Sequence, residues 1–195
     1  MALTLVIPPE VDPVTLDEVK MHARIDLDDE DDLLGDVIRA ATARLDGRDG
    51  LLGRCLISQT WRYTLPGFLP SIQIPLPPVR SVETVSYVDV DGLTCVLAPG
   101  DYTLYGMDDS QPAVLMPAYG KSWPTTRAIP EAVGITFSAG YGDAPSDVPE
   151  PIRAAIRMHV AHLYESRESV VVGMSSSMLP QGYQDLVADY RTWCF

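Results

Sequence analysis

Side chains that could bind a metal or transfer protons gather late in the chain. His159 and His162 are three residues apart, and Glu165 and Glu168 follow them. A zinc site needs three or four ligands that converge on one point. In a helix, however, His159 would share its face with apolar residues, and the spacing specifies no third ligand. We therefore interpret His159 as a packed side chain and His162 as a surface side chain.

A run of acidic residues resembles the start of a calcium-binding loop. Asp26, Asp28 and Glu30 take the first, third and fifth positions of such a loop. Calcium loops of this kind place a glycine at the sixth position and a bidentate acid at the twelfth, where this chain has Asp31 and Val37. The pattern fails. A helix that begins here explains the acids better, because carboxylates stabilise the positive end of a helix dipole.

Nucleophiles and phosphate loops are equally poorly supported. Gly173 precedes the serines at 175–177, but the segment lacks the G-x-S-x-G spacing of a nucleophile elbow. The glycines within 139–142 lack the context of a phosphate-binding loop, and there is no Walker A motif. Three cysteines without C-x-x-C spacing predict reduced thiols: Cys55, Cys95 and Cys194. We predict no catalytic residue, cofactor or metal.

Charge and hydropathy restrict the classes of partner. The 195 residues include 27 acidic and 14 basic side chains, for a formal net charge of -13, and 46% are hydrophobic. Binding to DNA draws its affinity from cations that displace phosphate counterions, and this chain has no basic run. No apolar stretch approaches the ~18 residues that span a bilayer, and the N-terminus lacks the basic region of a signal peptide. We expect a protein made in a cytoplasm, without a membrane partner.

Local patterns divide the chain into three parts. Thr15 and Glu18 form the spacing of a capping box, and apolar residues at helical intervals continue to about residue 46, which predicts two helices within 15–46. Residues 56–141 are rich in β-branched, aromatic, proline and glycine residues and predict short strands. Helices return in 150–195, interrupted by a flexible loop at 166–182. Residues 1–14 are expected to form an extended arm.

The order of these parts predicts an α+β fold in a single domain spanning residues 1–195. In this prediction the molecule is mainly a helical bundle, formed by the N- and C-terminal helices, and the β-rich segment is an insertion between them.

The sequence also resembles the head–tail connector (adaptor) proteins of long-tailed phages and phage-like gene transfer agents. The likeness rests on the order and spacing of several segments, none of which is diagnostic alone. These segments are 16–26 (LDEVKMHARID), 56–61 (LISQTW), 74–82 (IPLPPVRSV), 118–124 (AYGKSWP), 133–142 (VGITFSAGYG), 148–156 (VPEPIRAAI), 162–165 (HLYE) and 186–191 (LVADYR).

The resemblance implies a structural role at the head–tail interface of a phage-like particle. Such adaptors form a ring, typically of twelve copies, beneath the portal protein and join it to the next stopper or tail-proximal ring. DNA passes through the ring without specific binding, and the family offers no catalytic residues. Two other interpretations stay open: a transient cytoplasmic assembly factor and a small hydrolase.

The end of the chain is the predicted contact with the portal or a neighbouring subunit. The loop combines small residues with exposed apolar side chains, and large aromatic anchors follow it, a composition typical of interfaces. The residues assigned to this contact are Val170, Val171, Val172, Met174, Met178, Leu179, Tyr190, Trp193 and Phe195. The last helix itself could either dock in this way or pack on the helix before it.

Overall fold

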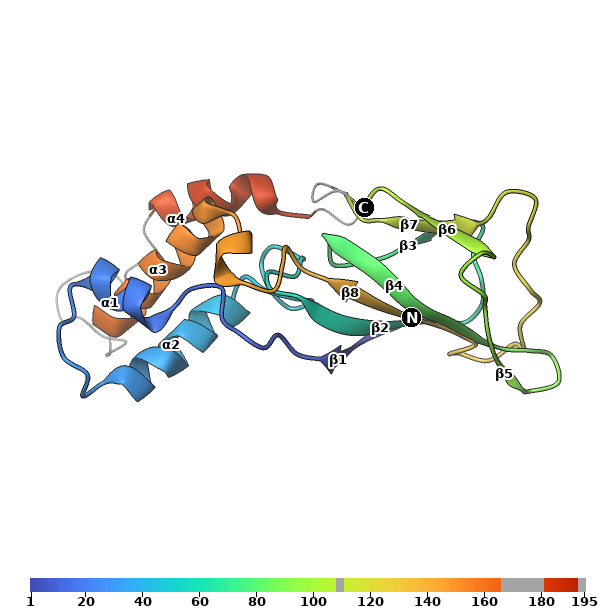
Figure 1. Cartoon of the computed structure of the whole chain (residues 1–195), viewed down its shortest axis with the longest axis horizontal. Coiled ribbons are helices and arrows are strands. Elements are labelled where there is room, and N and C mark those ends of the chain that lie inside the picture. The colour runs from blue at the N-terminus through green and yellow to red at the C-terminus, as the bar shows by residue number, and fades with distance from the viewer. Residues whose placement is uncertain (108–110, 166–180, 193–195) are drawn as a thin grey trace.

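A computed structural model describes residues 1–107, 111–165 and 181–192. The molecule is elongated, with helices gathered at one end and sheets at the other (Figure 1). The helices are α1 (Leu16–Ala23), α2 (Asp31–Ala43), α3 (Glu150–Glu165) and α4 (Gln181–Val187), with short 3-10 turns at Pro145–Asp147 and Ala188–Tyr190. We call this part the helical end. Among the described residues, no helix is both long and apolar enough to cross a membrane.

The strands form two antiparallel sheets, which we call the β end. The strands are β1 (Ala2–Ile7), β2 (Gln59–Leu65), β3 (Ile72–Gln73), β4 (Val79–Val88), β5 (Thr94–Val96), β6 (Tyr102–Tyr105), β7 (Val114–Pro117) and β8 (Val133–Ala139). The larger sheet has the order β1-β2-β8-β4-β5, and the smaller one has the order β3-β7-β6.

Helix α1 begins as the sequence predicts. The Thr15 hydroxyl accepts a hydrogen bond from the Glu18 amide, and the Glu18 carboxylate accepts one from the Thr15 amide. This capping box satisfies backbone donors that have no partner inside the helix. The helix ends at Arg24, which adopts a left-handed conformation with φ 56°. Arg153 of α3 pairs with Glu18, so the cap also holds α1 against α3.

Each end of the molecule has its own hydrophobic core. In the helical end, the buried apolar faces of α2, α3 and α4 pack together, and Leu34, Ile152 and Tyr183 are fully buried. In the β end, Phe137 and Ile135 of β8 lie beneath Leu115 of the small sheet. Alternate residues of each strand point to the same face of a sheet. The apolar residues on the facing sides of the two sheets therefore meet and form this core.

The structure confirms an α+β fold and corrects the balance within it. Among the described residues, helices account for 28% and strands for 27%, so the molecule is not mainly a helical bundle. The expected N-terminal arm is extended, but residues 2–7 are strand β1, which pairs with β2 from Ala2↔Thr64 to Ile7↔Thr60. The β-rich segment is thus half of the molecule rather than an appendage, because its two sheets enclose a core of their own.

Candidate functional site

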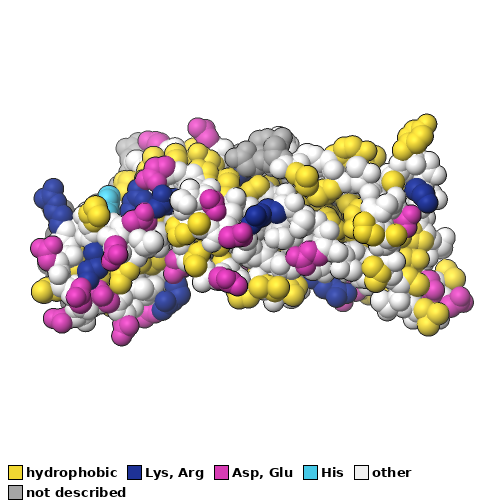
Figure 2. Space-filling view, in the orientation of Figure 1, with side chains coloured by type: hydrophobic (Ala, Val, Ile, Leu, Met, Phe, Trp, Pro, Cys, Tyr) yellow, Lys and Arg dark blue, Asp and Glu magenta, His cyan; other side chains and the backbone are white. Residues whose placement is uncertain are grey.

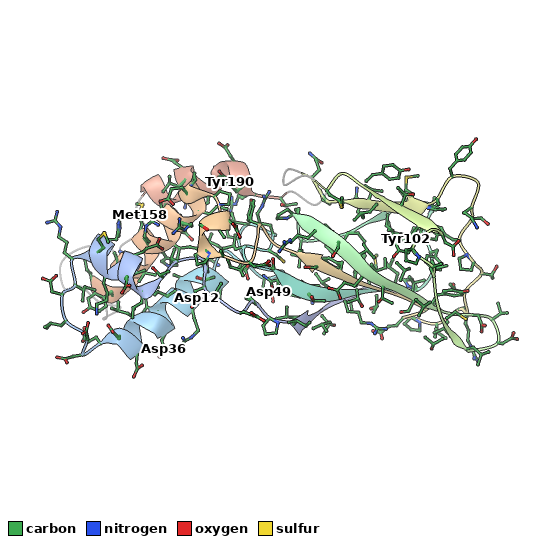
Figure 3. All side chains as sticks on the ribbon, in the orientation of Figure 1. Asp12, Asp36, Asp49, Tyr102, Met158 and Tyr190 are labelled. Atoms are coloured by element: carbon green, nitrogen blue, oxygen red, sulfur yellow. The ribbon has the colours of Figure 1, made fainter. Side chains whose placement is uncertain are left out.

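Most of the predicted interface residues fall outside the described part of the chain. Val170, Val171, Val172, Met174, Met178, Leu179, Trp193 and Phe195 all lie there. Tyr190 is described and is half-buried against the helical core. Figure 3 shows it on the helical end, beyond α4. Its ring faces the Arg54 guanidinium at 6.0 Å, within the range of a cation–π contact.

Helix α4 packs on the rest of the helical end. Tyr183 and Val187 are each 1% exposed, and the Tyr183 ring meets the His159 ring of α3 edge-on, with centroids 5.3 Å apart. Leu186 is partly buried against the same core. Of the two alternatives for the last helix, the structure favours packing, because its apolar side chains are already covered by α3.

Arg54 organises the junction between the two ends. The side chain is 3% exposed. One of its terminal nitrogens donates a hydrogen bond to the Tyr141 hydroxyl at 2.5 Å, and the other donates one to the Thr192 hydroxyl at 3.4 Å. The Thr192 amide also donates to the Leu52 carbonyl at 2.9 Å. The last described residues are therefore attached to the junction rather than to the tip of the helical end.

A second polar contact joins α2 to the large sheet. Asp46 accepts hydrogen bonds from the Leu56 amide at 2.7 Å and from the Gln59 side chain at 3.0 Å. Gln59 in turn accepts one from the Trp61 indole at 3.1 Å. Burial raises the pKa of Asp46, and the hydrogen bonds from Gln59 and Leu56 offset part of that effect. These contacts fix the start of β2 against the end of the helical segment.

The side chains considered for metal or acid–base chemistry do not converge. His159 is buried against Tyr183, and burial lowers its pKa, assisted by His162 and Arg44. Within the described ranges, no group of three or more histidines, cysteines and acids could hold a metal ion. Cys55 is buried, and burial raises its thiol pKa. Such a thiol is a packing residue rather than a nucleophile.

The acidic run lies where the sequence analysis placed it, at the start of α2. Asp31 and Asp32 occupy the first turn of the helix. Lys20 of α1 donates to Asp28 at 2.5 Å and to Asp31 at 2.8 Å, so part of the negative charge is paired. Acidic side chains crowd this tip of the molecule in the space-filling view (Figure 2). Acidic side chains outnumber basic ones in the segment from α1 to α2, so this tip carries excess negative charge.

Two apolar sheet edges are the surface features that the sequence analysis missed. Leu5, Val6 and Ile7 of β1 are 42%, 52% and 53% exposed. At the opposite edge of the same sheet, Leu93 and Val96 are each 65% exposed. The sequence does contain one signal of the β1 edge, which is the uncharged run from residue 1 to 9. This run can be identified as an edge strand only when its pairing with β2, about sixty residues away, is known.

Comparison with known proteins finds one matching family model and several similar solved structures. Residues 13–86 match the model of the phage gp6-like head-tail connector proteins. The chain is also similar to a protein in the virion of a native gene transfer agent particle, with 28% identity and a TM-score of 0.79 over 100% of this chain and 97% of the other.

Two further solved structures are similar over the same shares of the two chains. One is the neck of an empty gene transfer agent particle computed with C6 symmetry, at 27% identity and a TM-score of 0.78. The other is the neck of the native particle computed with C12 symmetry, at 25% identity and a TM-score of 0.75. No curated protein matches. The sequence match over residues 13–86 and the likeness over the whole chain confirm the predicted resemblance to the head–tail connector proteins of phage-like gene transfer agents.

Proposed function

We propose that this protein forms a homo-oligomeric ring in the neck of a phage-like particle, between the portal and the next tail-proximal or stopper ring. The observation that carries the proposal is the likeness over the full chain to proteins of gene transfer agent necks, two of them computed with cyclic symmetry. A ring of twelve copies agrees with the C12 neck. The packed cores of both ends suit a component whose task is to hold two larger parts together.

The charge of the chain suits a channel through which DNA passes. A net charge of -13 and the acidic tip of the helical end give no surface on which phosphates would be retained. Repulsion along the wall of such a channel would let the duplex slide. This property requires neither specific bases nor a catalytic group.

The composition of purified particles tests the proposal. We expect this protein in mature particles at twelve copies for each portal ring, measured by quantitative mass spectrometry. Cells that lack the gene should accumulate DNA-filled heads without tails, visible by electron microscopy. A transient assembly factor predicts the same defect but no protein in mature particles, so that pattern would contradict a place in the neck.

The contact with the portal is proposed to lie at the chain's C-terminal side, at the residues assigned from the sequence and at Tyr190. Because Thr192 is bonded to Arg54 and Leu52, a chain that ends at Thr192 retains the junction while it lacks Trp193 and Phe195. We expect this truncated protein to melt at the wild-type temperature and to attach poorly to portal-bearing heads in a co-sedimentation assay. Normal attachment would overturn the role of the last three residues.

The loop is tested separately. Replacing Val170, Val171 and Val172 with serine keeps the chain length and removes three apolar side chains. Reduced head attachment with an unchanged melting temperature would support docking by this segment. A matched triple replacement of exposed Leu27, Leu69 and Met116 by serine, away from this segment and from β1 and β5, should leave the head contact intact.

A further inference from the structure

The free edge of β1 lacks the features that normally protect a sheet edge. Edge strands in monomeric proteins are usually short, charged, interrupted by proline or covered, because their unpaired backbone groups can pair with another strand. β1 has six residues without a charged side chain, and prolines occur only after it, at Pro8 and Pro9. Within β1, only Leu3 is partly buried. The strand is held by its ladder with β2 and exposes apolar side chains on both faces.

The opposite edge of the same sheet, at β5, is short but is likewise uncharged and apolar. β5 has only three residues, Thr94–Val96, and they too are uncharged. Leu93 and Val96 are among the most exposed apolar side chains of the described chain, and Val90 in the preceding turn is 61% exposed. β1 and β5 are the two edge strands of one five-stranded sheet and are separated by its three other strands.

A closed ring of identical subunits needs this kind of arrangement. The contacts in such a ring are heterologous: one patch on each copy meets a different patch on the next copy. The two patches of one subunit therefore lie on opposite flanks of it. We propose that β1 of one copy pairs along the β5 edge of the next copy, so that the large sheet continues from subunit to subunit. This inference rests on the proposed ring and names the contact that closes it.

Strand directions give the proposal a definite geometry. Each neighbouring pair in the order β1-β2-β8-β4-β5 is antiparallel, so β1, β8 and β5 all run in the same direction. Rotation about a ring axis by one subunit nearly preserves that direction when there are many copies. β1 and the neighbouring β5 therefore pair in parallel.

The distribution of charge supports a second copy of the chain as the partner that pairs with the β1 edge. Two chains of net charge -13 repel one another, and the acidic tip of the helical end makes that end unsuited to self-contact. Residues 1–9 and the run 93–97 have no charged side chains except for the N-terminal amine. The two sheet edges are thus where copies can meet with the least repulsion while burying apolar surface.

A lysine on β1 tests the contact in the full-length protein. Val6→Lys places a charge on the proposed seam without disturbing a buried residue. The matched control is Met21→Lys, which adds the same charge at a position that is 79% exposed on α1. We expect Val6→Lys to lower the incorporation of the protein into particles about tenfold or more, because burying one charge at the contact costs enough free energy for such a change. Met21→Lys should assemble like the wild type. Equal assembly of the two variants would overturn the contact.

Cross-linking provides a second measurement. In a Cys194→Ser background, Val6→Cys and Val96→Cys are combined, and particles are treated with a short thiol-to-thiol reagent. A ladder of covalent multimers supports the β1–β5 contact, whereas assembled particles that yield only monomers refute it. Met21→Cys with Val96→Cys is the control and should give no ladder. Absence of the wild-type protein from particles would instead overturn the proposed ring, so failure of the ring and failure of this contact give different results.

Discussion

The two ends of the molecule differ most in where they place charge. Residues 56–141, which contain all strands except β1, have seven acidic and four basic side chains, whereas the rest of the chain has twenty and ten. The helical end therefore carries most of the negative charge, and the β end carries the uncharged edges. The difference suggests a division of tasks: one end remains soluble and repels anions, while the other is able to associate.

Their cores differ as well. The helical end buries polar side chains among its apolar ones: Thr42 of α2, His159 of α3 and the Tyr183 hydroxyl each have a buried polar atom without a hydrogen-bond partner in the structure. The β end also buries polar side chains, Gln59, Thr60 and Thr64 of β2, but each of them makes a side-chain hydrogen bond: to Asp46, Glu83 and the Ala2 carbonyl, respectively. We therefore expect the helical end to be the more sensitive of the two to pH and to the loss of a single side chain.

The largest effect is expected from Tyr183→Ala. This change removes a fully buried ring that holds α4 on α3, and large-to-small changes at such sites cost about 3–5 kcal/mol of unfolding free energy. Chemical denaturation followed by circular dichroism measures it. The control is Tyr105→Ala at a half-exposed position of β6, where we expect about 0.5 kcal/mol or less. Similar losses for both variants would show that α4 is not part of the core.

A smaller loss is expected from Arg54→Ala at the junction. The variant leaves the Tyr141 hydroxyl without its charged donor and removes a bond to Thr192, which together cost about 2 kcal/mol. Arg39→Ala is the control: Arg39 is exposed and pairs with Asp36 on the surface of α2, a kind of contact worth about 0.5 kcal/mol or less. Equal unfolding free energies for Arg54→Ala and Arg39→Ala would show that the hydrogen bonds of Arg54 do not stabilise the junction between the two ends.

The smallest effect is the pH dependence caused by His159. Burial, His162 and Arg44 lower its pKa below the ordinary value of 6.5, and Tyr183 covers the ring from α4. On acidification through 6.5 the unfolded chain binds a proton before the folded chain does, so the free energy of unfolding falls as pH drops below that value. His159→Gln should lose this fall in unfolding free energy below pH 6.5, whereas His162→Gln should retain it. Equal pH profiles for the wild type and His159→Gln, from urea titrations at several pH values, would refute the assignment.

Local sequence signals predicted the elements well where the cause of the structure is itself local. The capping pair Thr15 and Glu18 marked the start of the helical segment, and α1 begins there, at Leu16–Ala23. The dipeptide Asp91-Gly92 is a local turn signal between β4 and β5, and Gly92 has the positive φ of 89° that such a turn requires. In both cases the deciding hydrogen bonds or dihedral angles involve residues a few positions apart.

Features that depend on distant residues were not predictable in the same way. β1 looks like an arm because two prolines follow it, and its status as a strand depends on pairing with β2, some sixty residues away. Arg54 gave no local signal, since its partners Tyr141 and Thr192 are far along the chain. The role of Tyr190 at the portal remains a proposal, and its contact with Arg54 shows how the residue is held before any partner binds.

The place where the chain enters and leaves the β end has a consequence for the order of folding. Ile57 and Gly142 are bridged in parallel, and the Ser58 amide donates to the Gly142 carbonyl at 2.9 Å. The segment between them holds β2 and β8 and precedes α3, so α2 can meet α3 only after both strands have been synthesised. Closing so long a loop is entropically costly unless the sheet forms first. During synthesis, α1 and α2 must therefore wait, with their apolar faces open, until β8 has been made.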